Sequence, residues 1–429
     1  MDAMDAMDPS NPVDPLNPVD PLEPVGPMDI DLVDQDTYAR GGVPHDQFRW
    51  LRAHQPVYWH HGDRTRGWPG FWAVTRHEDV VHVSRHPELY SSYRRLSLFD
   101  EPPTEDLSAQ RMMMLNQDPP EHTRRRSLVN KGFTPRTIGA LKEHISEICE
   151  DLLDQVVARG TGTADFVTDI AAQLPLYVIC ELIGAPPEDR DKIFQWSNML
   201  IGYDDPDFRR SSEEGMDAAS QLYAYANELA ARRREDPRDD IVTRLLQPDE
   251  NGEELSVHEF DVFVLMLAVA GNETTRNAAS GGMLAFFEHP DQWARLVAAP
   301  ELAATAADEI VRWVSPVNLF RRTATQATVL HGQKIAEGDK VVVFYASANR
   351  DEAVFDRPDT FDITREPNPH IGFGGGGPHF CLGAHLARLE LSVLFETLSR
   401  RMPDIELAGN LRRLRSNFIN GIKEMPVRF

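Results

Sequence analysis

Cys381 has the most distinctive surroundings of any residue in this chain, because the run at 373–383 reads FGGGGPHFCLG. Its five glycines can adopt backbone angles that other residues rarely adopt. Because they have no side chains, they also let the loop lie against a large flat group. The recurrence of Leu382, Leu386 and Leu389 predicts a helix directly after the cysteine. Converging backbone N–H groups and a helix N-terminus both favour the charged form of a thiol. The pattern therefore indicates a presented thiolate.

Three kinds of site compete for this cysteine. Structural zinc needs further ligands at short spacing, whereas the other two cysteines, Cys149 and Cys180, each stand alone in apolar helical stretches. A nucleophilic cysteine would need distant His and Asn partners, which the sequence leaves open, but it does not require a surface flattened by glycines. An axial thiolate on haem iron explains both the glycines and the isolation of the sulfur. Haem is therefore the favoured partner.

The run at 373–383 resembles the haem-ligand loop of the cytochrome P450 superfamily. Gly377, His379, Cys381 and Gly383 match the glycine, basic residue, cysteine and glycine of that pattern. Phe373 lies eight positions before Cys381, one more than in the commonest pattern, so the loop carries an extra residue. The resemblance implies haem b as the cofactor, Cys381 as the axial ligand of its iron, and Gly377, His379 and Gly383 beside the group.

A second constellation lies at 268–275, which reads AVAGNETT inside a long apolar stretch. A helix over 256–288 is predicted because one face collects Phe260, Val264, Leu267, Gly271 and Thr274. Gly271 and the neighbouring hydroxyls weaken the backbone ladder, so the helix can open and hold water; a capped or kinked core helix is the alternative.

The same stretch resembles the oxygen-activating helix of the family, in which Glu273 and Thr274 occupy the acid and alcohol positions. That chemistry needs an acid that reaches solvent and an alcohol that reaches dioxygen, because cleaving the O–O bond consumes two protons. The resemblance therefore implies that Glu273 and Thr274 are the catalytic pair.

Glu309 and Arg312 share one face of a predicted helix. A pair at this spacing is most often a solvated surface bridge, but the flanks here are apolar, which favours a buried pair. The pair resembles the Glu-x-x-Arg of the family, a scaffold on the cysteine side of the haem. The family often adds an arginine from a later loop, where this chain has Thr360 instead; Arg357 and Arg365 are both candidates to replace it.

Haem carries two propionates, and buried carboxylates need cationic or multiply hydrogen-bonded partners. The family supplies them from positions that match His122, Arg126, Arg322 and His379. Two alternatives remain at this stage: 124–126 could form one solvated basic face, and Arg321 could be the inward arginine instead of Arg322.

The segments that usually line the substrate pocket in this family are overwhelmingly apolar here, which suits a lipid-like substrate, although core packing would explain any one of them equally well. The residues expected to line the pocket are Leu96, Met113, Met114, Leu200, Val269, Ala270, Val317, Leu319 and Phe418. The phrases AGNETTRNA, SANRDE and FINGIKEMPV resemble actinobacterial members that hydroxylate sterol side chains, methyl-branched lipids and isoprenoids, often at a terminal methyl group.

The organisation of the chain agrees with one large domain. No linker or repeat divides its 429 residues after the N-terminus, so we expect a mainly α domain with small β-sheets over 29–429. The resemblance places the haem between the oxygen-activating helix and the helix after Cys381. Helices are expected over 138–157, 166–183, 212–234 and 256–288, and strands at 57–58, 71–74, 329–330 and 341–344. Residues 1–28 are acidic and rich in proline, with NPVDPL occurring twice, so they read as a disordered tail; a proline-rich docking motif is the alternative.

Charge and composition limit the kinds of partner that the protein can have. A formal net charge of -24 argues against nucleic acid. The sequence has no apolar run long enough for a membrane anchor, and its three cysteines suit a reducing compartment, so we expect a soluble cytoplasmic protein. Arg124, Arg125 and Lys131 could form a local basic patch for an acidic ferredoxin, or simply a solvated helix face.

These expectations combine into a haem-thiolate monooxygenase that takes O2 and inserts one oxygen atom into a C–H bond of an apolar small-molecule substrate. Its electrons would come from a ferredoxin and an NAD(P)H-dependent ferredoxin reductase. One alternative is a peroxide-driven peroxygenase, against which the retention of Glu273 and Thr274 counts. Another is a non-catalytic haem-thiolate sensor or lipid-binding protein.

Overall fold

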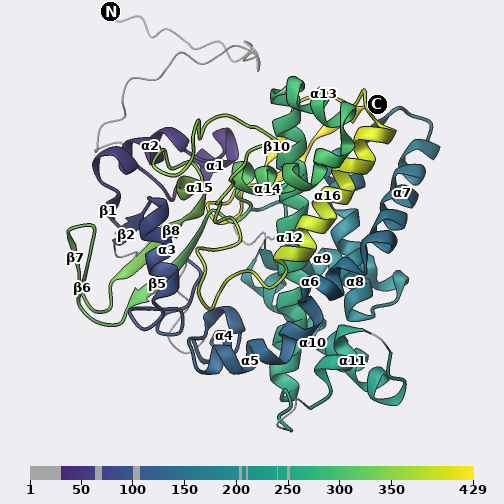
Figure 1. The fold of residues 1–429 in the computed structure, drawn as a ribbon. Helices are drawn as coiled ribbons and strands as arrows, with labels where there is room; N and C mark the ends of the chain where they lie inside the picture. Colours follow the sequence, from purple (N-terminus) through teal and green to yellow (C-terminus); the bar gives the residue numbers. More distant parts are fainter. Residues whose placement is uncertain are drawn as a thin grey trace, which may run out of the picture.

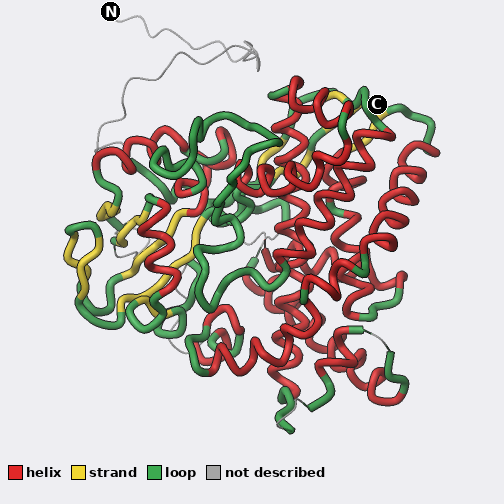
Figure 2. The backbone as a smooth tube through the Cα atoms, viewed as in Figure 1, coloured by secondary structure: helices red, strands yellow, loops and turns green. Residues whose placement is uncertain are grey.

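The computed structural model describes residues 30–62, 70–99, 107–201, 205–208, 211–238, 240–248 and 252–429, and the expected tail at 1–28 lies outside them. In the described chain, long helices fill one side of the molecule and a small sheet with short helices fills the other (Figures 1 and 2). The mainly α architecture with small sheets is the one predicted from the sequence.

The largest sheet of the described chain has five strands in the order β1-β2-β8-β5-β3, in which only β2 and β8 run parallel. Its strands are β1 (Val57–His60), β2 (Phe71–Val74), β3 (Tyr90–Ser91), β5 (Leu319–Ala324) and β8 (Lys340–Phe344). The short helices of this side are α1 (Gln35–Gly41), α2 (His45–His54), α3 (His77–Arg85) and α15 (Tyr345–Ala348). Strand β2 has the predicted bounds, and every residue of β8 is buried, as expected from its run of valines.

Three smaller sheets lie in the described chain, and the one that contains β4 and β12 joins distant parts of the sequence. They pair β10 (Arg412–Arg413) with β11 (Ile422–Glu424), β6 (Thr328–Leu330) with β7 (Gln333–Ile335), and β12 (Pro426–Arg428) with β4 (Thr163–Asp165) and β9 (Glu406–Leu407).

The long helix α12 (Val257–Glu288) runs through the helical side. Ser256 and Glu259 cap its N-terminus reciprocally, so the helix begins one residue after the predicted start. Most of its residues are buried, because neighbours pack on several faces: α8 (Gln173–Ile183), α9 (Arg190–Ile201), α10 (Ser212–Glu235), α14 (Ala303–Val314) and α16 (Ala384–Arg401). Gly281 and Gly282 allow the close approach of α14, since an added Cβ would meet Val314 at 2.7 Å and Ile310 at 2.8 Å.

Two of the predicted helices are interrupted. The stretch predicted as 166–183 consists of a π-helical turn (Val167–Ala171) followed by α8, because Pro175 has no N–H to donate to the carbonyl of Ala171. The stretch at 138–157 divides into the end of α6 (Pro135–Gly139) and α7 (Lys142–Ala158). The remaining helices are α4 (Leu107–Gln110), α5 (Glu121–Asn130), α11 (Ile241–Leu245) and α13 (Pro290–Ala298).

A buried ion cluster connects α14 to the segment that leads into the cysteine loop. Glu309 and Arg312 have no exposed side-chain surface, and their two hydrogen bonds measure 2.7 and 2.8 Å. The Nε of Arg365 donates to Glu309 Oε2 at 3.1 Å, and the backbone N–H of Asp362 donates to Oε1 at 2.9 Å. The pair is therefore buried, as its apolar flanks predict, and its carboxylate is shared by two guanidiniums.

Thr360 stands where the family often has an arginine, and Arg365 makes the contact with Glu309 instead. The side chain of Arg365 is 8% exposed, whereas that of Arg357 is 64% exposed and pairs with Asp356 and Asp362 instead. The carbonyl of Thr360 also accepts hydrogen bonds from Arg365 and Arg312, so the backbone at this position joins the same cluster.

We predict that Arg365→Ala lowers the free energy of unfolding by about 2 kcal/mol, because it removes charge-assisted hydrogen bonds from a buried carboxylate. Arg357→Ala is the matched control and should change it by less than about 0.5 kcal/mol. Thermal and denaturant unfolding of both variants test this, and equal losses would contradict the assignment of Arg365.

Candidate functional site

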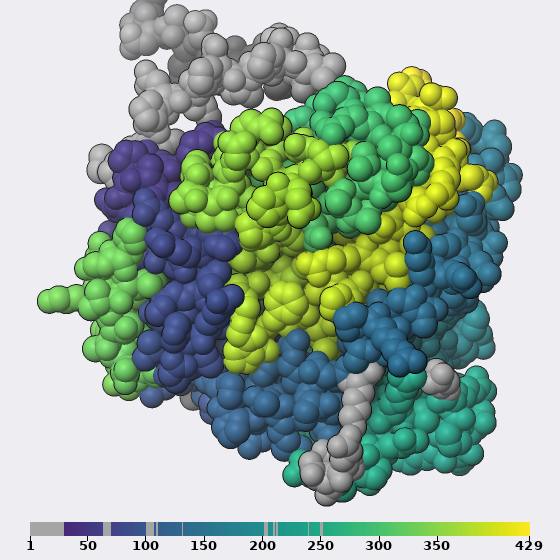
Figure 3. Space-filling view, viewed as in Figure 1, coloured from purple at the N-terminus to yellow at the C-terminus, as the bar shows by residue number. Residues whose placement is uncertain are grey.

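The cysteine loop lies between the sheet side and the helical side. In the space-filling view, the yellow-green to yellow part of the chain occupies the centre of this face, with the purple to dark-blue N-terminal part on one side and blue and teal parts of the chain on the other (Figure 3). Gly383 is the N-cap of α16, so a helix begins directly after the cysteine as predicted. The backbone N–H of Cys381 donates to the carbonyl of Phe373 at 2.9 Å, which closes the loop across its extra residue.

The glycines of the loop adopt unusual backbone angles, as predicted, and they also have a packing role that the sequence did not indicate. Gly374, Gly376 and Gly377 have φ of 101°, 86° and 73°, which side chains rarely allow. An added Cβ on Gly377 would lie 2.3 Å from the carbonyl oxygen of Ser84, and one on Gly375 would lie 2.7 Å from its hydroxyl. These glycines therefore let the loop turn tightly and pack against α3, rather than only flattening it for a ligand.

Cys381 is exposed, in contrast to Cys149 and Cys180. Protein nevertheless surrounds it closely enough that burial raises the pKa of its thiol, against the opposing effects of the Gly383 backbone and of Arg126 and Arg388. In the protein alone, burial thus outweighs the Gly383 backbone and the two guanidiniums in setting the direction of the pKa shift. A bound metal ion would deprotonate the thiol outright. Burial also raises the pKa of the other two thiols, to about 12. Both of those thiols are buried in the protein, so Cys381 is the candidate ligand because it is the exposed one.

The four side chains expected to face the propionates converge. His122 and Arg126 lie on α5, and the ring of His122 lies 4.3 Å from that of His379. Arg126 donates from Nη1 to the carbonyl of Pro378 at 3.0 Å. Burial, Arg126 and Arg322 lower the pKa of His122 to about 4, and burial, Arg322 and His122 hold that of His379 well below its usual range. The site thus combines two neutral imidazoles with two guanidiniums.

The structure also separates Arg321 from Arg322, which point to opposite sides of β5 because side chains alternate along a strand. Arg322 is the one whose charge depresses the pKa of both His122 and His379. Of the two arginines, Arg322 therefore faces the cluster.

The middle of α12 remains helical. Ala270 is exposed although it lies near the centre of this buried helix, and the Thr274 hydroxyl donates to its carbonyl at 2.8 Å. The helix continues through both residues, so the predicted opening is not present in this structure. Gly271 has a packing role instead, since an added Cβ would lie 3.0 Å from Ile179 of α8.

Glu273 is not in contact with solvent, contrary to expectation. Its side chain has no exposed surface and pairs with Arg276, which is 3% exposed and donates to Asn198 of α9 at 2.7 Å. Burial raises the pKa of Glu273, and Arg276 opposes that rise. Sequence reasoning overlooked Arg276, although its i, i+3 spacing from Glu273 was a usable signal.

Glu390 was also overlooked. It lies on α16 with 2% of its surface exposed, and burial raises its pKa to about 8 despite a hydrogen bond with Thr275 of α12. At neutral pH this carboxyl group is mostly protonated, and it joins the helix after the cysteine to the helix that carries Thr274.

Accessibility divides the residues expected to line a substrate pocket. Leu96 and Leu319 have no accessible surface, so in this structure they belong to the interior rather than to an accessible wall. Met114 and Phe418 are 9% and 6% exposed. Ala270 is exposed, and four others are partly buried: Met113, Leu200, Val269 and Val317.

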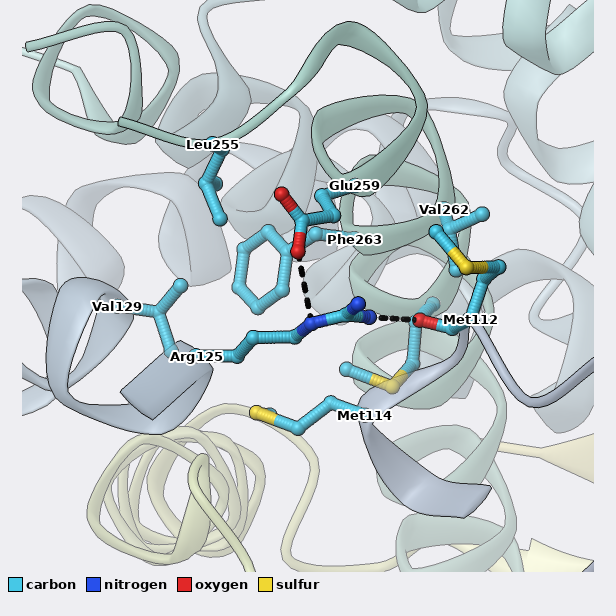
Figure 4. Close-up of a pocket in the computed structure, with 9 residues that line it drawn as sticks. Met112, Met114, Arg125, Val129, Leu255, Glu259, Val262 and Phe263 are labelled. Carbon is cyan, nitrogen blue, oxygen red and sulfur yellow. Dashed lines mark hydrogen bonds and ion pairs between the residues drawn. The ribbon is translucent and has the colours of Figure 1, made fainter. Parts of the chain in front are cut away.

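A small pocket lies between α5, the segment at 112–114 and the N-terminal half of α12 (Figure 4). Within it, Arg125 bridges Glu259 at 2.9 Å and the carbonyl of Met112 at 2.6 Å. Arg124 also pairs with Glu259, at 2.7 Å. Two cations of the expected basic patch are therefore paired with Glu259, although 34% of the Arg124 side chain is exposed. The side chain of Lys131 lies outside the described residues.

These residues fit haem b. Cys381 supplies one accessible thiol, and the cluster of His122, Arg126, Arg322 and His379 suits two carboxylates. Nδ1 of His122 is buried and has no hydrogen-bond partner among the described residues, as expected of a donor directed toward a group other than protein. Over the described residues, no helix combines the length and apolar character that crossing a membrane requires.

Comparison with known proteins identifies the family of this chain. The sequence profile of the family described as Cytochrome P450 matches residues 300–401. The steroid C26-monooxygenase of Rhodococcus jostii is 46% identical over 403 residues, which cover 92% of this chain and 84% of the relative. The methyl-branched lipid omega-hydroxylase of Mycobacterium tuberculosis is 42% identical and covers 93% and 94%.

Among solved structures, the Mycobacterium marinum cytochrome P450 CYP268A2 in complex with pseudoionone superposes with a TM-score of 0.87 at 38% identity, covering 96% of this chain and 100% of that one. The fold and the family expected from the cysteine loop are thus confirmed. The protein belongs to the cytochrome P450 family and is one of its haem-dependent monooxygenases.

Proposed function

We propose that this monooxygenase hydroxylates a methyl-branched hydrocarbon chain, such as a sterol side chain or a branched lipid, at a terminal carbon. The observation that carries the proposal is the 42–46% identity, over more than nine-tenths of this chain, to relatives named for those two activities. Partly buried apolar side chains such as Val269 and Leu200 would supply the contacts that a hydrocarbon needs. Electrons would come from a ferredoxin and its NAD(P)H-dependent reductase.

Each site residue has a role in this proposal. Cys381 binds the haem iron, while His122, Arg126, Arg322 and His379 bind the propionates. When bound, haem supplies the activation of dioxygen and the insertion of one oxygen atom. The chain excludes bulk water, holds the substrate and delivers protons.

Proton delivery would use Glu273 and Thr274, and the structure sets conditions for it. The Thr274 hydroxyl must exchange the Ala270 carbonyl for a new acceptor, which a side-chain rotation accomplishes. Glu273 must separate from Arg276 or receive water, because its carboxylate has no contact with solvent. Burial already raises its pKa and Arg276 opposes that rise, so Glu273 would hold a proton more firmly once it is separated from Arg276, as a proton donor must.

Two other functions remain to be distinguished by experiment. A peroxygenase would turn over with peroxide alone and would not need the acid–alcohol pair. A sensor or carrier would bind the lipid without steady consumption of NADPH in the presence of a redox partner.

We predict that Cys381→Ala abolishes the red-shifted Soret band of the ferrous–CO complex, because that band requires a thiolate ligand. Cys149→Ser and Cys180→Ser are the controls and should keep it, since both thiols are buried in the protein core. Survival of the band in Cys381→Ala would show that another residue binds the iron.

We predict that Thr274→Ala still binds substrate and oxidises NADPH, but diverts much of the electron flow to hydrogen peroxide because a proton donor is missing. Thr274→Ser retains the hydroxyl and should restore most of the product formed per NADPH. Unchanged coupling in the alanine variant would remove Thr274 from the mechanism.

We predict that sterols, methyl-branched lipids and isoprenoids shift the ferric haem toward high spin with micromolar or tighter affinity, since burial of a long hydrocarbon outweighs its ordering cost. Small polar aromatic compounds should bind far more weakly. Product analysis with a ferredoxin and reductase would then locate the hydroxyl group. A full spectral shift only with compact polar molecules would refute the substrate class while leaving the monooxygenase assignment intact.

A further inference from the structure

A second group of chemically active side chains lies away from the haem site, where the β6–β7 hairpin meets the start of α3. His331 is in the turn of this hairpin with φ of 46°, followed by Gly332 with φ of 78°. Two successive left-handed residues give a tight turn, which fixes the direction of the Cα–Cβ bond of His331. Nδ1 of His331 lies 3.5 Å from Oδ2 of Asp79 on α3.

Asp79 is a buried carboxylate that lacks the partners such a group normally requires. Its side chain is 9% exposed, and its Oδ2 has no hydrogen-bond partner among the described residues. Burial raises its pKa, while His331 and Arg76 oppose the rise. A buried carboxylate oxygen of this kind is stabilised by a cation in contact with it. The same oxygen is the one directed toward His331.

Glu78 completes the group. One ligand atom from each of Glu78, Asp79 and His331 lies within 4.8 Å of the other two. Two ligands of a tetrahedral zinc ion are roughly 3.3 Å apart when each bond is about 2.0 Å long. The distance from His331 Nδ1 to Asp79 Oδ2 is already close to this value, and the exposed side chain of Glu78 can rotate inward.

We propose that Glu78, Asp79 and His331 form a binding site for a divalent transition-metal ion, of which zinc is the first candidate. A mixed imidazole and carboxylate set suits zinc, cobalt or nickel, whereas calcium and magnesium prefer oxygen ligands alone. With three protein ligands, water would occupy the remaining coordination positions of the ion.

Two charged neighbours modulate this site. Asp351 adds negative charge near Asp79, which favours a cation. Arg76 acts against it, because its Nη1 lies 3.5 Å from Nε2 of His331. Metal bound at Nδ1 leaves the proton of the neutral ring on Nε2, so the guanidinium must move away.

The site would join the hairpin to the element that supports the cysteine loop. At the opposite end of α3, Ser84 contacts the positions of Gly375 and Gly377. A metal ion at the N-terminal turn would hold α3 to the hairpin, and it should raise the thermal stability of the holoenzyme by mass action.

The test is calorimetric titration of the full-length, tag-free holoenzyme with zinc chloride, followed by metal analysis after dialysis. The wild type should bind one ion at this site and gain thermal stability. Asp79→Asn and His331→Asn should each weaken binding by at least about tenfold, because each removes a ligand atom. Asparagine is chosen at His331 because it tolerates positive φ, so the hairpin is preserved. Arg76→Gln should tighten binding.

The matched control is His144→Asn. His144 is also exposed beside two carboxylates, but Glu147 and Glu181 face different nitrogens of its ring, so they cannot share one ion with it. This variant should bind zinc like the wild type. The ferrous–CO spectrum of each variant reports whether the haem domain is intact. Absence of zinc binding in the wild type, or full binding in both Asp79→Asn and His331→Asn, would overturn the proposal.

Discussion

The buried carboxylate of Glu309 is the interaction on which much of this structure depends. It has no contact with water, so it must receive its hydrogen bonds from protein, and it receives them from Arg312, Arg365 and the backbone of Asp362. Those donors belong to α14 and to the segment that enters the cysteine loop. Satisfying one anion therefore fixes the approach of that segment, and with it the position from which Cys381 is presented.

The two sides of the site differ in how they are held. On the cysteine side, the loop is set by backbone conformations and by close contact with α3, where an added Cβ on Gly377 would collide with Ser84. On the side of α12, polar side chains make exchangeable contacts: Thr274 with a carbonyl, and Glu273 with Arg276. The first arrangement suits a permanent ligand, and the second suits groups that must change partners during turnover.

The sequence predicted those site residues that lie in short patterns, and it did not predict those whose role depends on contacts between distant segments. Cys381, Glu273, Thr274 and the pair of Glu309 and Arg312 lie in short patterns, and the long helix and the strand at 71–74 follow from simple periodicity. The choice of Arg365 over Arg357 could not be predicted, because it depends on which side chain folds back onto Glu309. The same holds for Arg276: its spacing was visible, but its contact with Asn198 requires α9 to pack on α12.

Glu390 makes the stability of the fold depend on pH. In an unfolded chain its carboxyl group would titrate near 4.5, whereas in the folded protein the pKa is about 8. The folded state thus binds the proton more tightly, so the stability that this group contributes is fully present below about pH 4.5 and declines as the pH rises through 8. Deprotonation would place an uncompensated charge between α16 and α12. The contact between the helix after the cysteine and the helix of the acid–alcohol pair therefore loses stability as the pH rises from about 4.5 to about 8.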